Sequence, residues 1–269
     1  VLDAKRIKDG KKVVLKRVLT DGTEIGFFKF LHARRDDPRN RTIPLLDIVR
    51  MPDSPSMNQF LQVNLQFFCQ HFPEFVSPQG LQFMHDHNTV HFDIAPQNLV
   101  MDETRVVPGG SHFTNEQSHT GFPRRWFGWN IRCSVSPVDY YYIDFGLSLY
   151  YADGKDTATT TGTLRTFPDI PELSLKKPYN PFLVDIFQLG LTIYKLIDDY
   201  VDLEVFRPVA ESMTAADPNS RPSADDALVH LREIATTIPA AKLAEQIWRK
   251  DLTLWQRFSI AFRGGYTQD

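Results

Sequence analysis

The sequence predicts an α+β fold, in which a small strand-rich part (residues 1–64) precedes a larger and mainly helical part. Two observations support this division. Short β-branched runs separated by turn residues fill the first part, whereas apolar residues recur at helical spacing from Phe182 onward. With 269 residues, 42% of them hydrophobic, the chain can bury a substantial core.

The composition narrows the broad class of protein. A net charge of −3 gives no general attraction to nucleic acid, so we expect no nucleic-acid partner. Two cysteines are too few for a disulfide framework, and no secretory segment is visible. We therefore expect an intracellular protein, cytoplasmic or nuclear. The longest apolar run, residues 182–197, carries polar side chains and predicts a buried helix rather than a membrane span.

Strands and one helix are predicted for the first 64 residues. The Asp-Gly pair at 9–10 predicts a two-residue turn between strands at 1–8 and 12–18. Asp21-Gly22-Thr23 predicts a turn and an N-cap for a helix at 24–34. Further strands are expected at 44–49 and 60–63.

Residues 65–236 are predicted to be mainly helical. Pro73, Pro78 and Gly80 interrupt the first helix, which leaves 81–87 as its clearest piece. Residues 102–137 are polar, sustain no period and predict an inserted loop. A strand is expected at 140–143, followed by loop at 147–177. The later helices are expected at 182–197, 201–213, 224–236 and 240–262.

The last segment, residues 237–269, predicts a C-terminal helical tail. Large apolar side chains fall there at near-helical spacing among basic residues: Trp248, Leu252, Trp255, Phe258 and Phe262. Contact with a membrane surface is one interpretation of this pattern. We favour the other, a helix that packs its aromatic face on the larger part.

Two short segments carry the candidate chemistry. Asp93 and Asn98 lie five residues apart in a loop just before an apolar run, and Asp144 lies between an apolar strand and Gly146. The strand fixes Asp144 while the glycine lets the backbone turn away, which suits a metal ligand. Asn98 adds a neutral oxygen, and Asp93 remains to accept a proton from a hydroxyl. These are the parts needed to hold Mg-ATP and transfer its phosphoryl group.

Each motif alone also fits a structural role, and their joint order along the chain carries the argument. That order resembles the signature set of eukaryotic protein kinases over nearly the whole chain. The matching segments are Val13–Lys16, His91–Asn98, Asp144–Gly146, Ile170–Glu172, Asp185–Gly190 and Asp217–Pro222. More narrowly, the chain is similar to small kinase-like proteins of basidiomycete fungi, through residues 37–40, 80–85 and 180–182 and the insert before Asp144.

The resemblance implies a bilobal protein-kinase-like fold, with residues 1–64 and 65–236 as its lobes, and ATP and Mg²⁺ as cofactors. Lys16 would hold the α/β-phosphates and pair with Glu24, and Asp93 would be the catalytic base. Asn98 and Asp144 would bind Mg²⁺. The other implied roles belong to Val14 and Val100 around the adenine, to a Glu172–Arg221 pair, to Asp185 as anchor of the catalytic loop, and to His91 and Phe145 within the motifs.

Several features depart from the kinase pattern. Ala95 replaces the lysine of Ser/Thr kinases, and Gln97 is not the arginine of tyrosine kinases, so a cation that would neutralise the transferring charge is missing. Phe92 replaces the arginine that reads a phosphorylated activation loop, so activity need not depend on phosphorylation. Glu24 follows Lys16 by only eight residues, which predicts a place in the first turn of its helix.

The sequence also begins just after the position of the glycine-rich phosphate loop, with Val1 and Ala4 resembling the residues that follow it. We therefore expect a fragment or a truncated product. The hinge between the two lobes is expected within residues 60–68.

Three functions stay open. The first is an ATP- and Mg-dependent Ser/Thr-type protein kinase, whose protein substrate the sequence does not name. The second is a pseudokinase, a scaffold that keeps the fold with weak or no catalysis. The third is a small-molecule phosphotransferase of the aminoglycoside or choline type. Asp144–Gly146, followed by Ile170–Glu172 and Arg221, favours the protein-kinase branch over the third.

Overall fold

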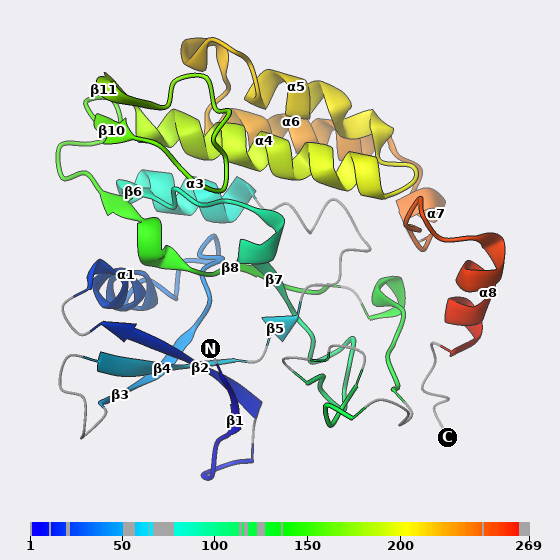
Figure 1. Ribbon diagram of the computed structural model, residues 1–269. Coiled ribbons are helices and arrows are strands. Elements are labelled where there is room, and N and C mark those ends of the chain that lie inside the picture. Colours follow the sequence, from blue (N-terminus) through cyan, green and yellow to red (C-terminus); the bar gives the residue numbers. More distant parts are fainter. Residues whose placement is uncertain are drawn as a thin grey trace.

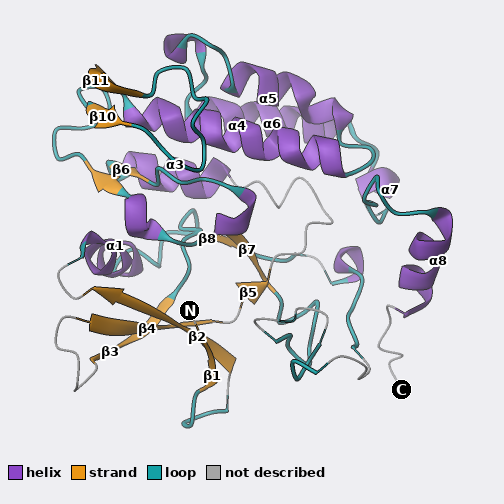
Figure 2. Ribbon diagram, viewed as in Figure 1, coloured by secondary structure: helices purple, strands orange, loops and turns teal. Residues whose placement is uncertain are grey.

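A computed structural model shows helices gathered at one side of the molecule and the largest sheet at the other (Figures 1 and 2). This arrangement agrees with the predicted α+β class. The structure describes residues 2–10, 12–19, 22–50, 57–63, 65–66, 78–112, 115, 118–122, 127–135, 137–243 and 245–263. Of the predicted hinge at 60–68, residues 60–63 and 65–66 are described and residues 64, 67 and 68 are not.

The N-terminal part is a four-stranded antiparallel sheet in the order β1-β2-β4-β3. Its strands are β1 (Leu2–Lys5), β2 (Lys12–Leu19), β3 (Leu45–Arg50) and β4 (Met57–Val63). The predicted two-residue turn is wrong, because Lys5 pairs with Lys12 and residues 6–11 lie between the strands. Gly10 adopts a φ of +69° there, and its N–H donates to the Arg6 carbonyl.

Helix α1 (Thr23–His32) lies between this sheet and the helical part (Figure 1). It begins after Gly22 without a side-chain cap and ends two residues earlier than the sequence predicts. Ile25, Phe28 and Leu31 are buried, so the helix places one apolar face in the core. Glu24 lies in its first turn, as expected.

Three small sheets join segments that are distant in sequence. Strands β5 (Leu65–Gln66), β7 (Leu99–Asp102) and β8 (Tyr140–Tyr142) form one, and β6 (Thr89–Val90) pairs with β9 (Leu149–Tyr150) in another. The third pairs β10 (Thr160–Gly162) with β11 (Ser174–Tyr179). The segment 147–177, predicted as loop, therefore contains β9, β10 and most of β11. Strand β9 pairs with residues 89–90, and β10 pairs with β11 after an intervening loop.

The helical part packs α3 (Pro78–Asp86), α4 (Pro181–Asp199), α5 (Arg207–Met213) and α6 (Ala224–Thr237) together. Asn180 caps α4 by accepting the Phe182 N–H. Helix α5 begins later than predicted, because Glu204–Phe206 forms a 3-10 turn. No helix among the described residues is long and apolar enough to cross a membrane.

The predicted interruption is wrong at Gly80, whereas α3 begins at Pro78 and Pro73 lies outside the described residues. Pro78 is the first residue of the helix, where its missing N–H costs nothing. Gly80 lies inside the helix because its backbone approaches other groups closely. A Cβ at this position would lie 2.7 Å from the Arg41 Cβ and 2.8 Å from the Tyr142 ring.

The predicted continuous tail helix is also wrong. It is replaced by α7 (Ala240–Leu243) and α8 (Leu254–Arg263), and residues 245–253 between them form no helix. That chain pairs with the end of α4: Val201 N–H donates to the Trp248 carbonyl, and Lys250 N–H donates to the Asp199 carbonyl. The favoured packing of the aromatic face fails for α8, since Trp255 is 80% and Phe258 57% exposed.

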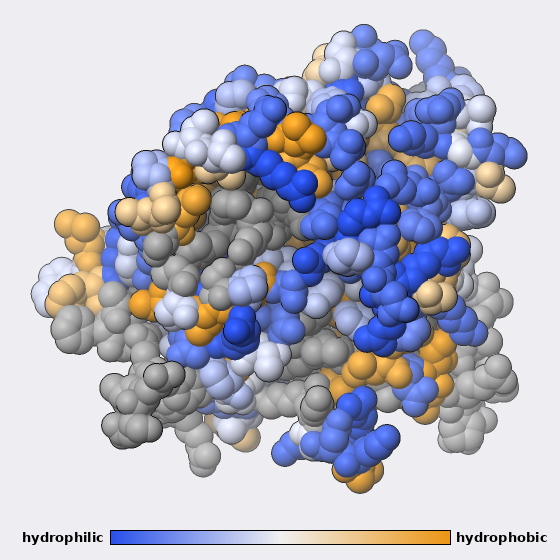
Figure 3. Space-filling model, turned by 180° about the vertical axis from the view of Figure 1, so that it is seen from behind, coloured by the Kyte–Doolittle hydropathy of each residue, from blue (hydrophilic) through white to orange (hydrophobic). Residues whose placement is uncertain are grey.

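The insert at 102–137 contacts the main core through residues near its beginning and in its later part. Val106 and Val107 are buried in that core, and Phe127 and Trp129 pack against it. A second, smaller core cluster includes Phe92 and Phe182. On the face seen from behind, hydrophilic residues dominate the described surface and hydrophobic ones form small separate patches (Figure 3).

Candidate active site

Side chains of α4 form hydrogen bonds with the backbone of the loop that carries Asp93. Asp185 is fully buried, and its carboxylate accepts the N–H of His91 at 2.8 Å and of Phe92 at 2.7 Å. One turn later, Gln188 accepts the Ile94 N–H at 2.9 Å and donates to the Phe92 carbonyl at 3.2 Å. Two side chains of one helix thereby satisfy four polar groups that are buried with the loop.

Phe92 occupies a backbone conformation that a bulky residue rarely adopts. Its φ is +67°, and the bonds from Asp185 and Gln188 hold it there. Its side chain is buried in the second core cluster, together with Ala158, Leu164 and Ile170. An apolar contact therefore joins the loop to the 149–179 segment at the position where the kinase pattern has an arginine.

His91 connects this loop to the strand that precedes Asp144. The ring is fully buried, and its Nε2 lies 3.0 Å from the Ile143 carbonyl, so Nε2 donates. Its Nδ1 accepts the Asp93 N–H at 3.3 Å. The network thus assigns the neutral Nε2–H tautomer. Burial lowers the pKa of His91, against the opposing charge of Asp185.

Asn98 contacts Asp93 through its side chain and the strand before Asp144 through its backbone. Its amide nitrogen donates to the Asp93 carbonyl at 2.8 Å and to the Asp93 carboxylate at 2.9 Å. Its backbone carbonyl accepts the N–H of Ile143, the residue before Asp144. These bonds fix the Asp93 side chain and leave the amide oxygen of Asn98 available as a ligand.

Lys16 brings the sheet, α1 and Asp144 together. Its ammonium group donates to Glu24 and, at 2.8 Å, to the Asp144 carboxylate. Burial lowers the pKa of Lys16, but the bonds to Asp144 and Glu24 outweigh it and hold the pKa above its usual value. Burial likewise opposes ionisation of Asp144, yet the bond from Lys16 leaves its pKa lowered. The pair is therefore charged at neutral pH.

Phe145 fixes the turn after Asp144. Its ring is fully buried, 5.2 Å from the Phe28 ring of α1 and 5.3 Å from the His91 ring. Asp144 itself has a φ of +65° and accepts the Gly146 N–H. These edge-on and tilted ring contacts join α1, this turn and the loop at 91–98 in one packed unit.

Glu172 and Arg221 form a buried ion pair, with Nη2 2.8 Å from Oε2. Arg221 also donates to the Leu183 carbonyl and to the Ala215 carbonyl, both at 2.9 Å. Its guanidinium lies 4.6 Å from the centroid of the Phe187 ring. One residue thus ties together three segments.

The structure brings most of the predicted site residues together through the bonds above. Val14 and Val100 are both buried, on β2 and β7, and their place around an adenine stays a prediction. Gln188 was missed in the sequence. Its signal was a second polar side chain three residues after Asp185 in an otherwise apolar helix, which places both on one face.

Oxygen donors for a magnesium ion are present in Asn98 and Asp144. Mg²⁺ is usually held by one or two protein oxygens together with water and phosphate, so these two residues fit it. Within the described residues, no group of three or more His, Cys, Asp or Glu side chains is arranged to hold a metal ion by itself.

Comparison with known proteins agrees with this arrangement. The chain is 23% identical over 181 residues to the Serine/threonine-protein kinase STY46 of Arabidopsis thaliana, a match that covers 67% of this chain and 24% of that protein. It is 26% identical over 133 residues to the Probable serine/threonine-protein kinase MARK-A of Dictyostelium discoideum, covering 49% of this chain and 9% of that protein. No family model matches.

The chain thus spans a quarter or less of the length of these two relatives. Their similarity, together with the mixed α/β architecture, supports a protein-kinase-like domain.

Proposed function

We propose that the chain is an ATP- and Mg²⁺-dependent protein kinase of the Ser/Thr type, with a bilobal fold whose lobes are residues 1–64 and 65–236. The observation that carries this proposal is the connected set of Lys16, Glu24, Asp93, Asn98 and Asp144. Lys16 is ion-paired to both Glu24 and Asp144, and Asn98 holds Asp93.

Each residue of this set has a part in phosphoryl transfer. Asp93 accepts the proton of the substrate hydroxyl, whose oxygen forms a bond to the γ-phosphorus while the bond to the ADP oxygen breaks. Lys16 neutralises the α/β-phosphates, and Glu24 holds Lys16 in place. Asn98 and Asp144 would hold Mg²⁺, which supplies charge neutralisation between the phosphates.

The test is phosphoryl transfer from labelled ATP to a general protein substrate. We expect transfer by the wild-type chain, its loss in Asp93→Asn, and wild-type transfer in the exposed control Asp153→Asn. Transfer that persists in Asp93→Asn would remove this residue from the mechanism. Phosphorylation of small alcohols but not of proteins would favour the small-molecule phosphotransferase.

A pseudokinase is the second candidate, and Ala95 favours it. Ala95 is buried in the loop that ends with Asn98, and its methyl group supplies no positive charge where Ser/Thr kinases carry a lysine. Saturable nucleotide binding without transfer would select this function. Absence of any thermal shift with Mg-ATP would contradict both nucleotide-dependent functions.

Two finer parts of the proposal concern origin and location. The motifs at 37–40, 80–85 and 180–182 support a relationship to small kinase-like proteins of basidiomycete fungi. The composition supports an intracellular location. Separation of tagged protein into cytosolic, nuclear and membrane fractions tests the second part, and recovery in the membrane fraction would contradict it.

A further inference from the structure

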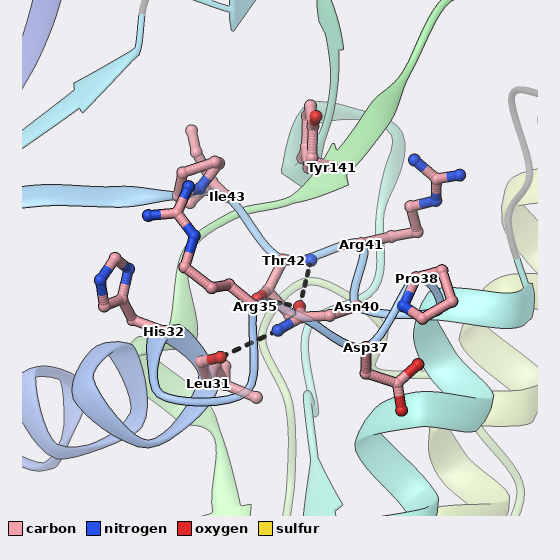
Figure 4. A pocket seen from close by; sticks show the side chains of 11 residues that line it. Leu31, His32, Arg35, Asp37, Pro38, Asn40, Arg41, Thr42, Ile43 and Tyr141 are labelled. Carbon is pink, nitrogen blue, oxygen red and sulfur yellow. Dashed lines mark hydrogen bonds between the residues drawn. The ribbon is translucent and has the colours of Figure 1, made fainter.

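A polar pocket of about 230 Å³ lies at the end of α1 (Figure 4), and neither Lys16 nor Asp93 is among its lining residues. Its wall comes from three places: the last turn of α1, the loop at 35–44, and Tyr141 of β8. This volume is below that of a typical drug-sized ligand site and suits a smaller molecule.

Two cationic or donor groups of the pocket lack partners. The Arg35 side chain is exposed and makes no hydrogen bond or ion pair with any residue that the structure describes, while its backbone N–H donates to the His32 carbonyl at 3.2 Å. The Nδ1 atom of His32 is buried and has no hydrogen-bond partner in that part of the chain. Figure 4 shows the Arg35 side chain and the His32 ring on the same side of the pocket. Both groups can donate to an acceptor placed between them.

The acceptors of the pocket, by contrast, are already used. Asp37 accepts the Arg39 side chain at 2.9 Å and the Arg39 N–H at 2.8 Å, and these bonds hold its pKa below the usual value. Asn40 donates to the Leu31 carbonyl at 2.8 Å and accepts the Thr42 N–H at 3.0 Å. The pocket therefore offers an excess of donors, with the one acidic side chain of its lining neutralised.

A third cation, Arg41, lies on the other side of Asn40 in Figure 4. Its Nη1 donates to Asp139 at the surface, and a guanidinium carries five N–H donors in all. Arginine groups match the geometry of phosphate oxygens, which accept two parallel hydrogen bonds.

We propose that this pocket binds the phosphate group of a small phosphorylated molecule. Arg35 and His32 would donate to the phosphate oxygens, and the remaining volume would hold the esterified part. Arg41 would contribute positive charge from the opposite rim.

The pocket is joined to both halves of the candidate active site. Leu31 and His32 end the helix whose first turn holds Glu24. On the opposite wall, Tyr142 N–H donates to the Arg41 carbonyl and Ile43 N–H donates to the Tyr142 carbonyl, two residues before Asp144. A ligand that draws Arg35 inward would thus act on α1 and β8 together, and phosphoryl transfer would change. This effect rests on the proposed function, whereas the binding does not.

The experiment titrates the whole chain with glycerol phosphate and, separately, with inorganic phosphate, by isothermal calorimetry at constant ionic strength. We expect saturable binding of the ester at one site. Arg35→Ala, which breaks no described contact, should weaken binding at least tenfold. The control Arg232→Ala, an exposed arginine of α6, should leave it unchanged. Lys16→Met should also leave it unchanged, because the candidate nucleotide site lies elsewhere.

Equal binding by wild type and Arg35→Ala would overturn the proposal. So would loss of binding in Lys16→Met, which would assign the phosphate to the nucleotide site. Binding of a phosphoserine peptide without binding of glycerol phosphate would also overturn the proposal, because the ligand would then be a phosphorylated protein segment and not a small molecule. Ester binding that survives in a chain with no transfer activity supports the pocket and counts against the proposed function alone.

Discussion

The Asp185 carboxylate accepts two backbone N–H groups and lies 3.0 Å from His85 Nε2, with no exposure to solvent. Replacing it with alanine leaves buried donors without an acceptor. We expect Asp185→Ala to lower the free energy of unfolding by about 3–5 kcal/mol. Chemical denaturation measures the change. The exposed Asp198→Ala on the same helix should stay within about 0.5 kcal/mol of wild type, and a similar loss in both variants would contradict the anchor.

His91 gives the protein a specific pH dependence. Its folded pKa is lowered by burial, whereas the unfolded value is about 6.5. Below that value the unfolded chain binds more protons than the folded one, so stability falls as pH falls toward the folded pKa. The stability that neutral His91 contributes is therefore complete above the unfolded pKa and lost in acid.

This dependence can be measured by denaturation at pH 7.5 and 5.0. We expect His91→Gln to be less stable than wild type at pH 7.5 and the difference to narrow at pH 5.0. Thr236→Ala, at an exposed residue of α6 without a titratable group, should show no such narrowing. A difference that stays constant or widens in acid would show that His91 is not held neutral.

Some properties of single residues can be predicted from the sequence, and others cannot. Lys16, Asp93, Asn98 and Asp144 belong to motifs with fixed spacing, and the structure places them in one connected network. The conformation of Phe92 leaves no such signal, because nothing local in the sequence forces a bulky residue to a positive φ. Bonds from a helix ninety or so residues later impose it.

At the scale of single elements, two helix glycines differ sharply. A Cβ at Gly80 of α3 would meet Arg41 and Tyr142 below 3 Å, whereas a Cβ at Gly26 of α1 would meet nothing within 4 Å. We expect Gly80→Ala to cost about 1–3 kcal/mol of stability. Gly26→Ala should add about 0.5–1 kcal/mol. Thermal denaturation of the two variants checks both signs, and equal effects would contradict this difference in packing.

The elements predicted most accurately are those with their own strong pattern. Helix α4 has a long apolar period and an Asn cap, and its observed bounds lie within two residues of the predicted ones. Strands β9 and β10 are short and depend on pairing with distant segments, so local sequence does not mark them. The prediction of a continuous tail helix failed for a related reason. The backbone at residues 248–250 forms hydrogen bonds with the end of α4 and the residues after it, and does not continue a helix.

At the scale of the whole molecule, Arg221 joins Glu172, Leu183 and Ala215 across the helical part. We expect Arg221→Gln to cost about 3–5 kcal/mol, because Glu172 would stay buried without its partner. Glu172→Gln should cost a comparable amount, and the double variant less than the sum of the two. Urea denaturation of the four proteins gives the coupling energy, and strict additivity would contradict a shared ion pair.

The bonds from Asp185 of α4 affect when the loop at 91–98 can fold during synthesis. Ninety-four residues separate His91 from the aspartate that accepts its N–H. A growing polypeptide therefore contains residues 91–98 long before it contains the helix whose side chains hold that loop. We expect this loop to stay unformed on nascent chains that end before α4, and to acquire its protected amides only after that helix has emerged.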